Sequence, residues 1–328
     1  MAVQTLEKPA SASGDLIRVP VSAIVPERVI GVPLYVADKT QACGHRLYRG
    51  SEFPITRKDL EKLADAGVSH LLIDSDDRKT FQGHLRDGLA DTIADGDLKD
   101  KQRFSVLNQV VRDTLGDCFA AGDDDKTLIE TKEMGRHTVD LISRQDVVAT
   151  GLSDVLCHDY HTFTHSTNVA FYCVLLAQGL GISDHAELEA IAVAGFLHDL
   201  GKLDIADDIL TKPGKLNDEE FATIQRHPTV GFRRLCNRED LSLGQLMMVY
   251  QHHERINGKG YPVGVAGEEI HYWARICAVA DVFEALTSTR PYRKGMPWSE
   301  AYEIMDRGDG THFDKDIYAC WKSIQKSR

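Results

Sequence analysis

The chain has 328 residues, of which 42% are hydrophobic, so it is long enough for two domains with cores of their own. Its 38 lysines and arginines against 50 aspartates and glutamates give a net charge of −12, which argues against general binding to a nucleic-acid polymer or an anionic membrane. The seven cysteines are scattered without a CxxC pair, and there is neither a signal-peptide pattern nor an apolar run near ~18 residues. We therefore expect a cytoplasmic protein with no membrane span.

The first part of the chain predicts a small α+β module. Residues 1–14 are small and polar and predict a disordered tail. Residues 15–90 alternate strand and helix patterns, and this module is expected to be regulatory or sensory. Its predicted elements are strands over 16–21 and 31–38, a turn near Gly50, a helix between Thr56 and Gly67, and a strand over 68–74. Its histidines His45, His70 and His84 are isolated, so we expect no catalytic site here.

From residue 91 to residue 328 the pattern is helical almost throughout, which predicts an all-helical bundle. Apolar residues at three- and four-residue spacing predict helices over 100–121 and 125–149. The three aspartates at 123–125 separate these helices, and we interpret them as a solvated loop and helix N-terminus rather than a metal site, because negative charge is favourable there.

Seven polar residues lie in or beside apolar helical patterns of this region, where an unpaired imidazole or carboxylate is costly. Such a set is tolerated if its members converge on a positive charge that satisfies all of them. Five imidazoles, two carboxylates and no thiolate are typical of a multinuclear site for Fe, Mn or a similar first-row metal rather than a structural zinc site. The candidate metal ligands are His165, His198, Asp199, His227, His252, His253 and Asp281.

Local patterns indicate how these side chains reach a common point. His161 lies four residues before His165, so both project from one helix face. Asp199 follows His198 directly, and its carboxylate is able to bridge two metals, which an imidazole cannot do. Gly201 permits another backbone to approach this turn closely.

Two further helices are predicted to deliver the remaining histidines. A capping box over 217–220 opens a helix expected to carry His227 at its end, before a proline. The apolar helix over 243–251 ends at His252 and His253, and a glycine-rich turn over 257–262 follows.

Taken singly, any of these histidines would more often be an ordinary packed residue, and Asp281 would more often pair with an arginine. The seven together, in this order and with apolar flanks, favour the metal site. The adjacent pair His158 and Asp159 lacks the following Gly-Lys, so we interpret it as a solvated cap. Three histidines in polar or loop contexts are expected at the surface: His185, His271 and His312.

Six motifs in this order resemble the HD-GYP domain, a branch of the HD phosphohydrolase superfamily that cleaves bacterial cyclic dinucleotides. The resemblance covers residues 158–314, and the residues before about 80 look like the module often found ahead of such domains. The motifs are HSTNVA at 165–170, FLHDLGK at 196–202, ILTKPGKL at 209–216, RHPTVG at 226–231, HHERINGKGYP at 252–262 and ARICAVADVFEALTSTRPYR at 274–293.

The resemblance implies roles for particular residues. The seven candidate ligands would hold two metals bridged by Asp199, and His161 would be a candidate ligand of a third metal. Lys202 would act in catalysis beside Asp199 and would contact phosphate together with Arg290 and Arg293. The substrate pocket would be shaped by Tyr261, Gly258 and Gly260.

The chain departs from the family pattern at four positions, none of which is a candidate ligand. These departures bear on substrate preference rather than on activity. They are Ala206 where Pro is common, Ile256 where an aromatic is common, Asn257 where Asp is common, and Lys315 where Pro is usual.

The implied function is metal-dependent hydrolysis of a 3′-5′ phosphodiester in cyclic di-GMP, giving a linear dinucleotide, GMP or both, without a covalent protein nucleophile. Two or three ions per chain, Fe or Mn, are the expected cofactor. Two alternatives stay open: hydrolysis of another cyclic dinucleotide or nucleotide, and a non-catalytic cyclic di-GMP receptor that acts through a partner. The amino-terminal module is the expected contact for a homodimer or a signalling partner.

Overall fold

The computed structural model describes residues 15–38, 40–41, 43–143, 162–212, 214–289 and 294–326. They form two compact units, which divide inside helix α4 between Val110 and Val111. The first is a small α+β unit and the second is helical, as the sequence predicted. The domain boundary expected near residue 90 stays a prediction.

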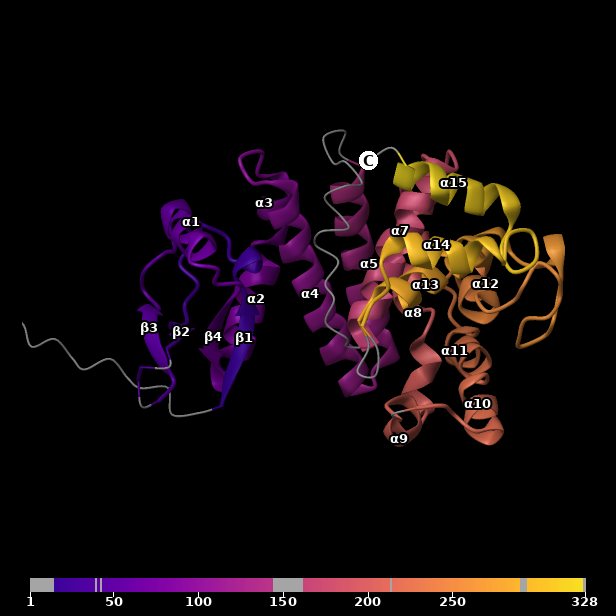
Figure 1. Cartoon of the computed structure of the whole chain (residues 1–328), viewed down its shortest axis with the longest axis horizontal. Helices are drawn as coiled ribbons and strands as arrows, with labels where there is room; N and C mark the ends of the chain where they lie inside the picture. The colour runs from indigo at the N-terminus through magenta and orange to yellow at the C-terminus, as the bar shows by residue number, and fades with distance from the viewer. Residues whose placement is uncertain are drawn as a thin grey trace, which may run out of the picture. The chain divides into compact units, whose positions relative to one another are not determined.

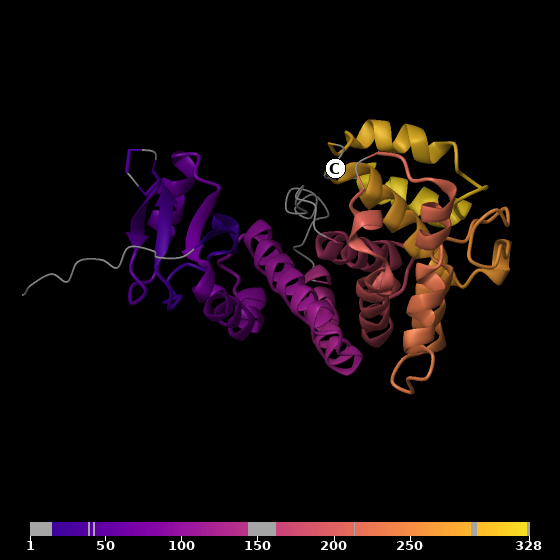
Figure 2. The same ribbon diagram turned by 90° about the horizontal axis from the view of Figure 1, so that it is seen from below.

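The first unit contains a four-stranded antiparallel sheet with the order β1-β4-β2-β3. Its strands lie side by side in both views (Figure 1 and Figure 2). The outer strand β1 pairs with β4 from Leu16 opposite Asp74 to Pro20 opposite His70. The strands are β1 Leu16–Pro20, β2 Leu34–Ala37, β3 His45–Arg49 and β4 His70–Asp74.

Helix α1 begins and ends where its sequence signals predicted. The side chain of Thr56 accepts a hydrogen bond from the backbone of Asp59, whose carboxylate accepts one from the backbone of Thr56. Gly67 adopts a φ of +70° beyond the helix end, a conformation that favours glycine. The helices of this unit are α1 Arg57–Asp65, α2 Arg78–Asp87, α3 Leu89–Ala94 and the first half of α4 Asp100–Ala121.

Strand β3 was not predicted from the sequence. It is an edge strand that pairs with β2, and two of its five residues are exposed. Charged residues such as Arg46 and Arg49 suit an edge strand because they oppose pairing with a further chain. Because of these charged residues, the segment lacks the hydrophobic alternation from which a strand is predicted.

The second unit is a bundle of helices around α7, α8 and α13. In Figure 1, α14 and α15 lie at one end of this unit and α9 and α10 at the other. Helix α8 packs on α7 so closely that a Cβ added at Gly195 would lie 2.6 Å from the Cα of Ala170. The helices are α5 Asp124–Ile142, α7 Thr162–Gly179, α8 His185–Leu197, α9 Asp207–Leu210, α10 Asp218–Ile224, α11 His227–Leu235, α12 Leu243–Gln251, α13 Tyr272–Thr287, α14 Trp298–Asp306 and α15 Lys315–Lys326.

The two long helices predicted around the aspartate triplet are present, with one correction. Helix α4 ends at Ala121 as predicted, whereas α5 ends at Ile142 with Ser143 as its C-cap, and residues 144–149 lie outside the described residues. The side chain of Asp123 caps α5 by accepting a hydrogen bond from the backbone of Lys126, as expected for a helix N-terminus.

The other two aspartates of the triplet, Asp124 and Asp125, are more than solvated charges. They form ion pairs with Arg234 and Arg238, which ties the start of α5 to α11 and the turn after it. Along the part of the chain that is described, none of the helices combines the length and the apolar character needed to cross a membrane.

Candidate metal centre

The side chain of Asp199 lies at the centre of the predicted ligand set. Asp199 follows His198, which caps the end of α8, and precedes a short 3-10 helix, η3, over Leu200–Asp204. One carboxylate oxygen lies 3.2 Å from Nε2 of His227 and 3.9 Å from Nε2 of His252. The other lies 3.4 Å from Nε2 of His198 and 3.5 Å from Nε2 of His165. The two oxygens therefore face two different groups of imidazoles.

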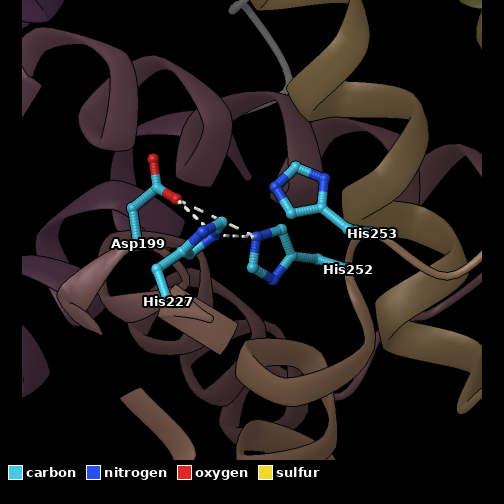
Figure 3. Close-up of side chains that lie close together, drawn as sticks. All are labelled: Asp199, His227, His252 and His253. Carbon is cyan, nitrogen blue, oxygen red and sulfur yellow. Dashed lines mark hydrogen bonds and ion pairs between the residues drawn. The ribbon is translucent and has the colours of Figure 1, made fainter. Parts of the chain in front are cut away.

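These side chains form two groups of potential ligand atoms that share Asp199. One group joins Asp199 to His227, His252 and His253, and within each group the ligand atoms all lie within 4.8 Å of one another. In Figure 3 the carboxylate of Asp199 and the rings of His227 and His252 point toward one another, with His253 beside His252. The second group is His165, His198 and Asp199.

Backbone carbonyls set the orientation of three of the imidazoles. The Nδ1 atoms of His198, His227 and His252 lie 2.8, 2.7 and 2.9 Å from carbonyl oxygens of the preceding helical turn. A carbonyl oxygen only accepts, so each Nδ1 carries a proton, and in the neutral ring each Nε2 presents a lone pair. All three lone pairs consequently point toward Asp199.

This arrangement fits a bound cation. The Nε2 atoms of His227 and His252 lie 3.2 Å apart, and with both protons on Nδ1 neither can donate to the other. The buried Nε2 of His198 has no hydrogen-bond partner within the described residues. Burial, followed by the neighbouring imidazoles, holds the pKa of His252 well below its usual range, so protonation does not relieve the contact. Lone pairs of this kind are satisfied by metal ions.

His165 completes the second group and is held by a buried carboxylate. Its Nδ1 donates a hydrogen bond to Glu284, and its Nε2 lies 3.1 Å from Asp281. Burial by itself would lower the pKa of His165, but the carboxylates of Glu284 and Asp281 raise it to about 9. Glu284 also accepts hydrogen bonds from the amide of Asn168 and the hydroxyl of Ser288.

Asp281 lies between His165 and His253, on the face of α13 that is turned toward the centre. Its second oxygen is 3.8 Å from Nδ1 of His253. Burial would raise the pKa of Asp281, but the neighbouring histidines hold it well below its usual range. The pKa of Asp199 is also held well below its usual range, because the charges of His198 and Lys202 lower it more than burial raises it. Both carboxylates are therefore ionised and available to cations.

Close backbone packing fixes the distance between Asp199 and His227. A Cβ added at Gly201 would lie 2.0 Å from the carbonyl oxygen of His227 and 2.6 Å from the backbone nitrogen of Gly231. The predicted close approach at Gly201 is thereby confirmed. The predicted position of His227 at the end of a helix is wrong: His227 is the first residue of α11, with Pro228 in the first turn, where proline is favoured.

The glycine-rich turn after α12 is held by Glu254, a side chain that is 1% exposed. Its carboxylate accepts hydrogen bonds of 2.7 and 3.0 Å from the backbone nitrogens of Val263 and Gly264. A Cβ added at Gly260 would lie 2.4 Å from the Cα of Glu254, and Gly258 adopts a φ of +71°. These two glycines allow the turn to fold back on the segment that carries His253.

The turn places Tyr261 beside the ligand groups. Its ring lies 4.7 Å from that of His253, and its backbone nitrogen donates to the carbonyl of His253. Burial raises the pKa of the Tyr261 hydroxyl, which therefore stays protonated and able to donate. The ammonium of Lys202 lies 2.5 Å from Asp199. Lys202 and Asp199 line one pocket with Ser166 on α7.

Several candidates from the sequence fall outside the described residues, namely His161, Arg290, Arg293, His158 and Asp159. Of the three histidines expected at the surface, His185 is half-exposed and pairs with Asp140 and Glu189. His271 caps α13 and is partly buried. His312 is also partly buried and stacks on Phe313, so the expectation of a surface residue was wrong for it.

Sequence reasoning missed Glu284 and the role of Glu254. Glu284 lies three residues after Asp281, and Asn168 lies three residues after His165, so each shares a helix face with a candidate ligand. An acidic residue at this spacing inside an apolar helix was the signal. Which imidazole Glu284 contacts depends on how α7 and α13 pack.

The fold and these groups define a helical domain with a buried His-Asp metal centre. Residues 151–317, about half of the chain, match the model of the HD domain. The chain belongs to the HD domain family, and its motifs place it in the HD-GYP branch. Family membership and the two His/Asp groups together make this a site for divalent metal ions.

Two relatives are named as cyclic-dinucleotide phosphodiesterases. A cyclic di-GMP phosphodiesterase of Pseudomonas aeruginosa is 44% identical over 50% of this chain and 39% of its own length. A 3′3′-cGAMP-specific phosphodiesterase of Vibrio cholerae is 44% identical over 44% of this chain and 33% of its own length. The chain thus spans about a third to two fifths of the length of these relatives.

A solved structure shares the fold. An HDG"Y"P protein from Bdellovibrio bacteriovorus matches 95% of this chain and all of its own, with a TM-score of 0.68 and 20% sequence identity. At that identity the likeness concerns the architecture alone.

Proposed function

We propose that this protein is a metal-dependent phosphodiesterase that hydrolyses a 3′-5′ phosphodiester of cyclic di-GMP to the linear dinucleotide, to GMP, or to both. The observation that carries the proposal is the buried carboxylate of Asp199, whose two oxygens face two separate groups of imidazoles. A carboxylate in that position is suited to bridge two ions. Relatives that share the domain are named for phosphodiester hydrolysis of cyclic dinucleotides.

The proposed cofactor is two first-row ions per chain, Fe or Mn, because imidazole and carboxylate ligands without thiolate suit these metals. The first would be held by His227, His252 and His253, and the second by His165, His198 and Asp281, with Asp199 shared. Such ions lower the pKa of a bound water and offset the charge of a phosphoryl group. A third ion at His161 remains a further proposal.

The residues around the ligand groups orient the substrate. Lys202, which pairs with Asp199 and lines the same pocket, would contact a phosphate oxygen through its ammonium. Tyr261, whose ring contacts that of His253, and the turn with Gly258 and Gly260 would shape the substrate pocket. Arg290 and Arg293 follow α13 in the sequence and are proposed as bidentate phosphate contacts.

Two other functions remain under consideration. A relative named for 3′3′-cGAMP supports hydrolysis of another cyclic dinucleotide as the first alternative. The second is a receptor that binds the nucleotide without turnover and acts through a partner. The complete set of inward-pointing imidazoles speaks against a receptor, because binding alone does not need a water-activating centre. We further propose that the first unit contacts a second copy or a signalling partner, and that the protein is cytoplasmic.

A substrate panel tests the proposal. The protein is purified without oxygen, its metals are quantified, and turnover is measured with cyclic di-GMP, 3′3′-cGAMP and a cyclic mononucleotide. We expect about two ions per chain and fastest hydrolysis of cyclic di-GMP. Asp199→Asn should lose turnover, whereas Asp208→Asn, at an exposed aspartate of α9, should not. Tight binding of cyclic di-GMP by the metal-loaded protein without any product would support the receptor instead.

A further inference from the structure

A second pocket lies between the glycine-rich turn and the loop that follows α14. It is an open pocket with a cavity volume of about 230 Å³. Its walls come from three segments of the second unit: the residues after α12, Val282 on α13, and the end of α14 with its loop. Its lining includes Arg255, Asn257, Val282, Arg307, His312 and Phe313.

This pocket faces away from the metal centre. Val282 lines it, whereas the preceding residue, Asp281, points toward the histidines. Consecutive residues on a helix point about 100° apart, so the two sites use different faces of α13. The same division occurs after α12, where Glu254 is buried against the glycine-rich turn and Arg255 is exposed and lines the pocket.

Two arginines in the pocket have no anionic partner among the residues that the structure describes. Neither Arg255 nor Arg307 makes an ion pair or side-chain hydrogen bond within the described residues. The aspartate next to Arg307, Asp306, is instead engaged by Tyr318 and Lys322. In a chain with a net charge of −12, two guanidinium groups left together in one concave site indicate recognition of an anion.

The walls that carry these arginines are fixed by the backbone. The carbonyl of Gly308 accepts hydrogen bonds from the backbone nitrogens of Thr311, His312 and Phe313. The loop is joined to the opposite wall because Asn257 and Ile256 donate to the carbonyls of Thr311 and His312 at 2.9 and 3.3 Å. A site built on a fixed loop loses little entropy when it binds a ligand.

The remaining lining is suited to a ring rather than to a bare anion. His312 stacks on Phe313 with ring centroids 4.3 Å apart and planes 9° from parallel. Burial, followed by the charge of Arg255, lowers the pKa of His312 to about 4, so its ring is neutral and able to donate one hydrogen bond. Val282, Ile304 and Met305 add apolar surface. Nucleobases bind to surfaces of this kind by stacking and apolar contact.

We propose that this pocket binds a nucleoside monophosphate, with the phosphate between Arg255 and Arg307 and the base against the apolar wall. The site would be distinct from the metal centre and would not depend on hydrolysis. An inorganic phosphate would satisfy the arginines but leave most of the pocket unfilled.

Binding is tested by calorimetric titration of the full-length, metal-containing protein with GMP, inorganic phosphate and guanosine. We expect GMP to bind more tightly than phosphate and far more tightly than guanosine. Arg307→Gln, which keeps a polar side chain but removes the charge, should weaken GMP binding by about 10- to 100-fold, as loss of a charge-assisted contact does. Arg255→Gln should act alike. Arg233→Gln is the matched control, because Arg233 is an exposed arginine on α11 outside the pocket.

The outcomes are separable. GMP held at the metal centre would bind equally well to wild type and Arg307→Gln, and equal affinities would overturn the proposal. Equal affinity for phosphate and GMP would overturn the assignment to a nucleotide. Melting temperatures show whether both variants are folded. If Arg255→Gln disturbs the neighbouring turn, the affinity of Arg307→Gln for GMP decides the test. Because no turnover is measured, failure here is distinct from failure of the proposed phosphodiesterase activity.

Discussion

The Nδ1 of His165 donates its proton to the carboxylate of Glu284, and this contact joins α7 to α13 at the metal centre. It leaves the Nε2 of His165 directed at Asp281 and Asp199. A carboxylate behind a histidine ligand fixes the tautomer and increases the basicity of the ring. Glu284 is therefore a positioning residue.

We expect Glu284→Ala to weaken metal binding by about 10- to 100-fold, as changes behind a metal-ligating histidine typically do. The measurement is metal content after dialysis against graded concentrations of a chelator. Glu303→Ala, at an exposed glutamate of α14, is the control and should keep wild-type metal content. Full metal retention in Glu284→Ala would show that packing alone orients His165.

Removal of metal should lower the melting temperature of wild type. Chelation leaves the lone pairs of His227 and His252 facing each other at 3.2 Å in a buried site. Ions present at about 100 times their dissociation constant stabilise a folded protein by about 2.7 kcal/mol. Asp199→Ala should show little change on chelation, because the shared carboxylate is absent. An equal shift in both proteins would place the stabilising metal elsewhere.

Gly201→Ala should destabilise the protein and empty the metal centre. The new Cβ would lie 2.0 Å from the carbonyl oxygen of His227, so backbone must move, at a cost of about 3 kcal/mol. Gly83→Ala makes the same change in α2, where no atom lies within 4 Å, and should be neutral or stabilise by up to about 1 kcal/mol. Chemical denaturation of both variants gives the comparison. A stable Gly201→Ala with full metal content would contradict the close packing.

Glu254→Gln should affect substrate rather than metal. Its carboxylate holds the backbone nitrogens of Val263 and Gly264, and hydrogen bonds to a charged group contribute about 1.5–3 kcal/mol each. A looser turn would misplace Tyr261, so we expect a higher KM with unchanged metal content. Glu268→Gln, at an exposed glutamate beyond the turn, should leave both unaltered. Metal loss in Glu254→Gln would mean that the turn supports His252 and His253 directly.

The phosphate contacts proposed from the resemblance are tested in the same assay. Arg290→Ala and Arg293→Ala should each reduce kcat/KM by about 10- to 100-fold, because each removes a charge-assisted contact to phosphate. Metal content should stay at the wild-type value. Loss of metal from either variant would assign that arginine to support of the centre instead.

The sequence by itself determined the helical class of the second unit and the residues that gather at its centre. Apolar periodicity located α4 and α12, and capping signals located the start of α1 and α10, because these features depend on neighbours within a few residues. The candidate ligands stood out because a charged or imidazole side chain is costly in an apolar helix unless something satisfies it. Six motifs in order then indicated the family.

Only the tertiary structure decided which groups face each other. The division of the ligands between the two oxygens of Asp199 depends on how α7, α8 and α11 pack, and no spacing along the chain contains that information. Edge strand β3 could not be predicted for a related reason. It forms because it pairs with β2, and the polar sequence of β3 contains no signal of that pairing. Glu284 acquires its role only because α13 lies against His165. Contacts between distant segments depend on packing, whereas helix periodicity and capping depend on residues that are close in the sequence.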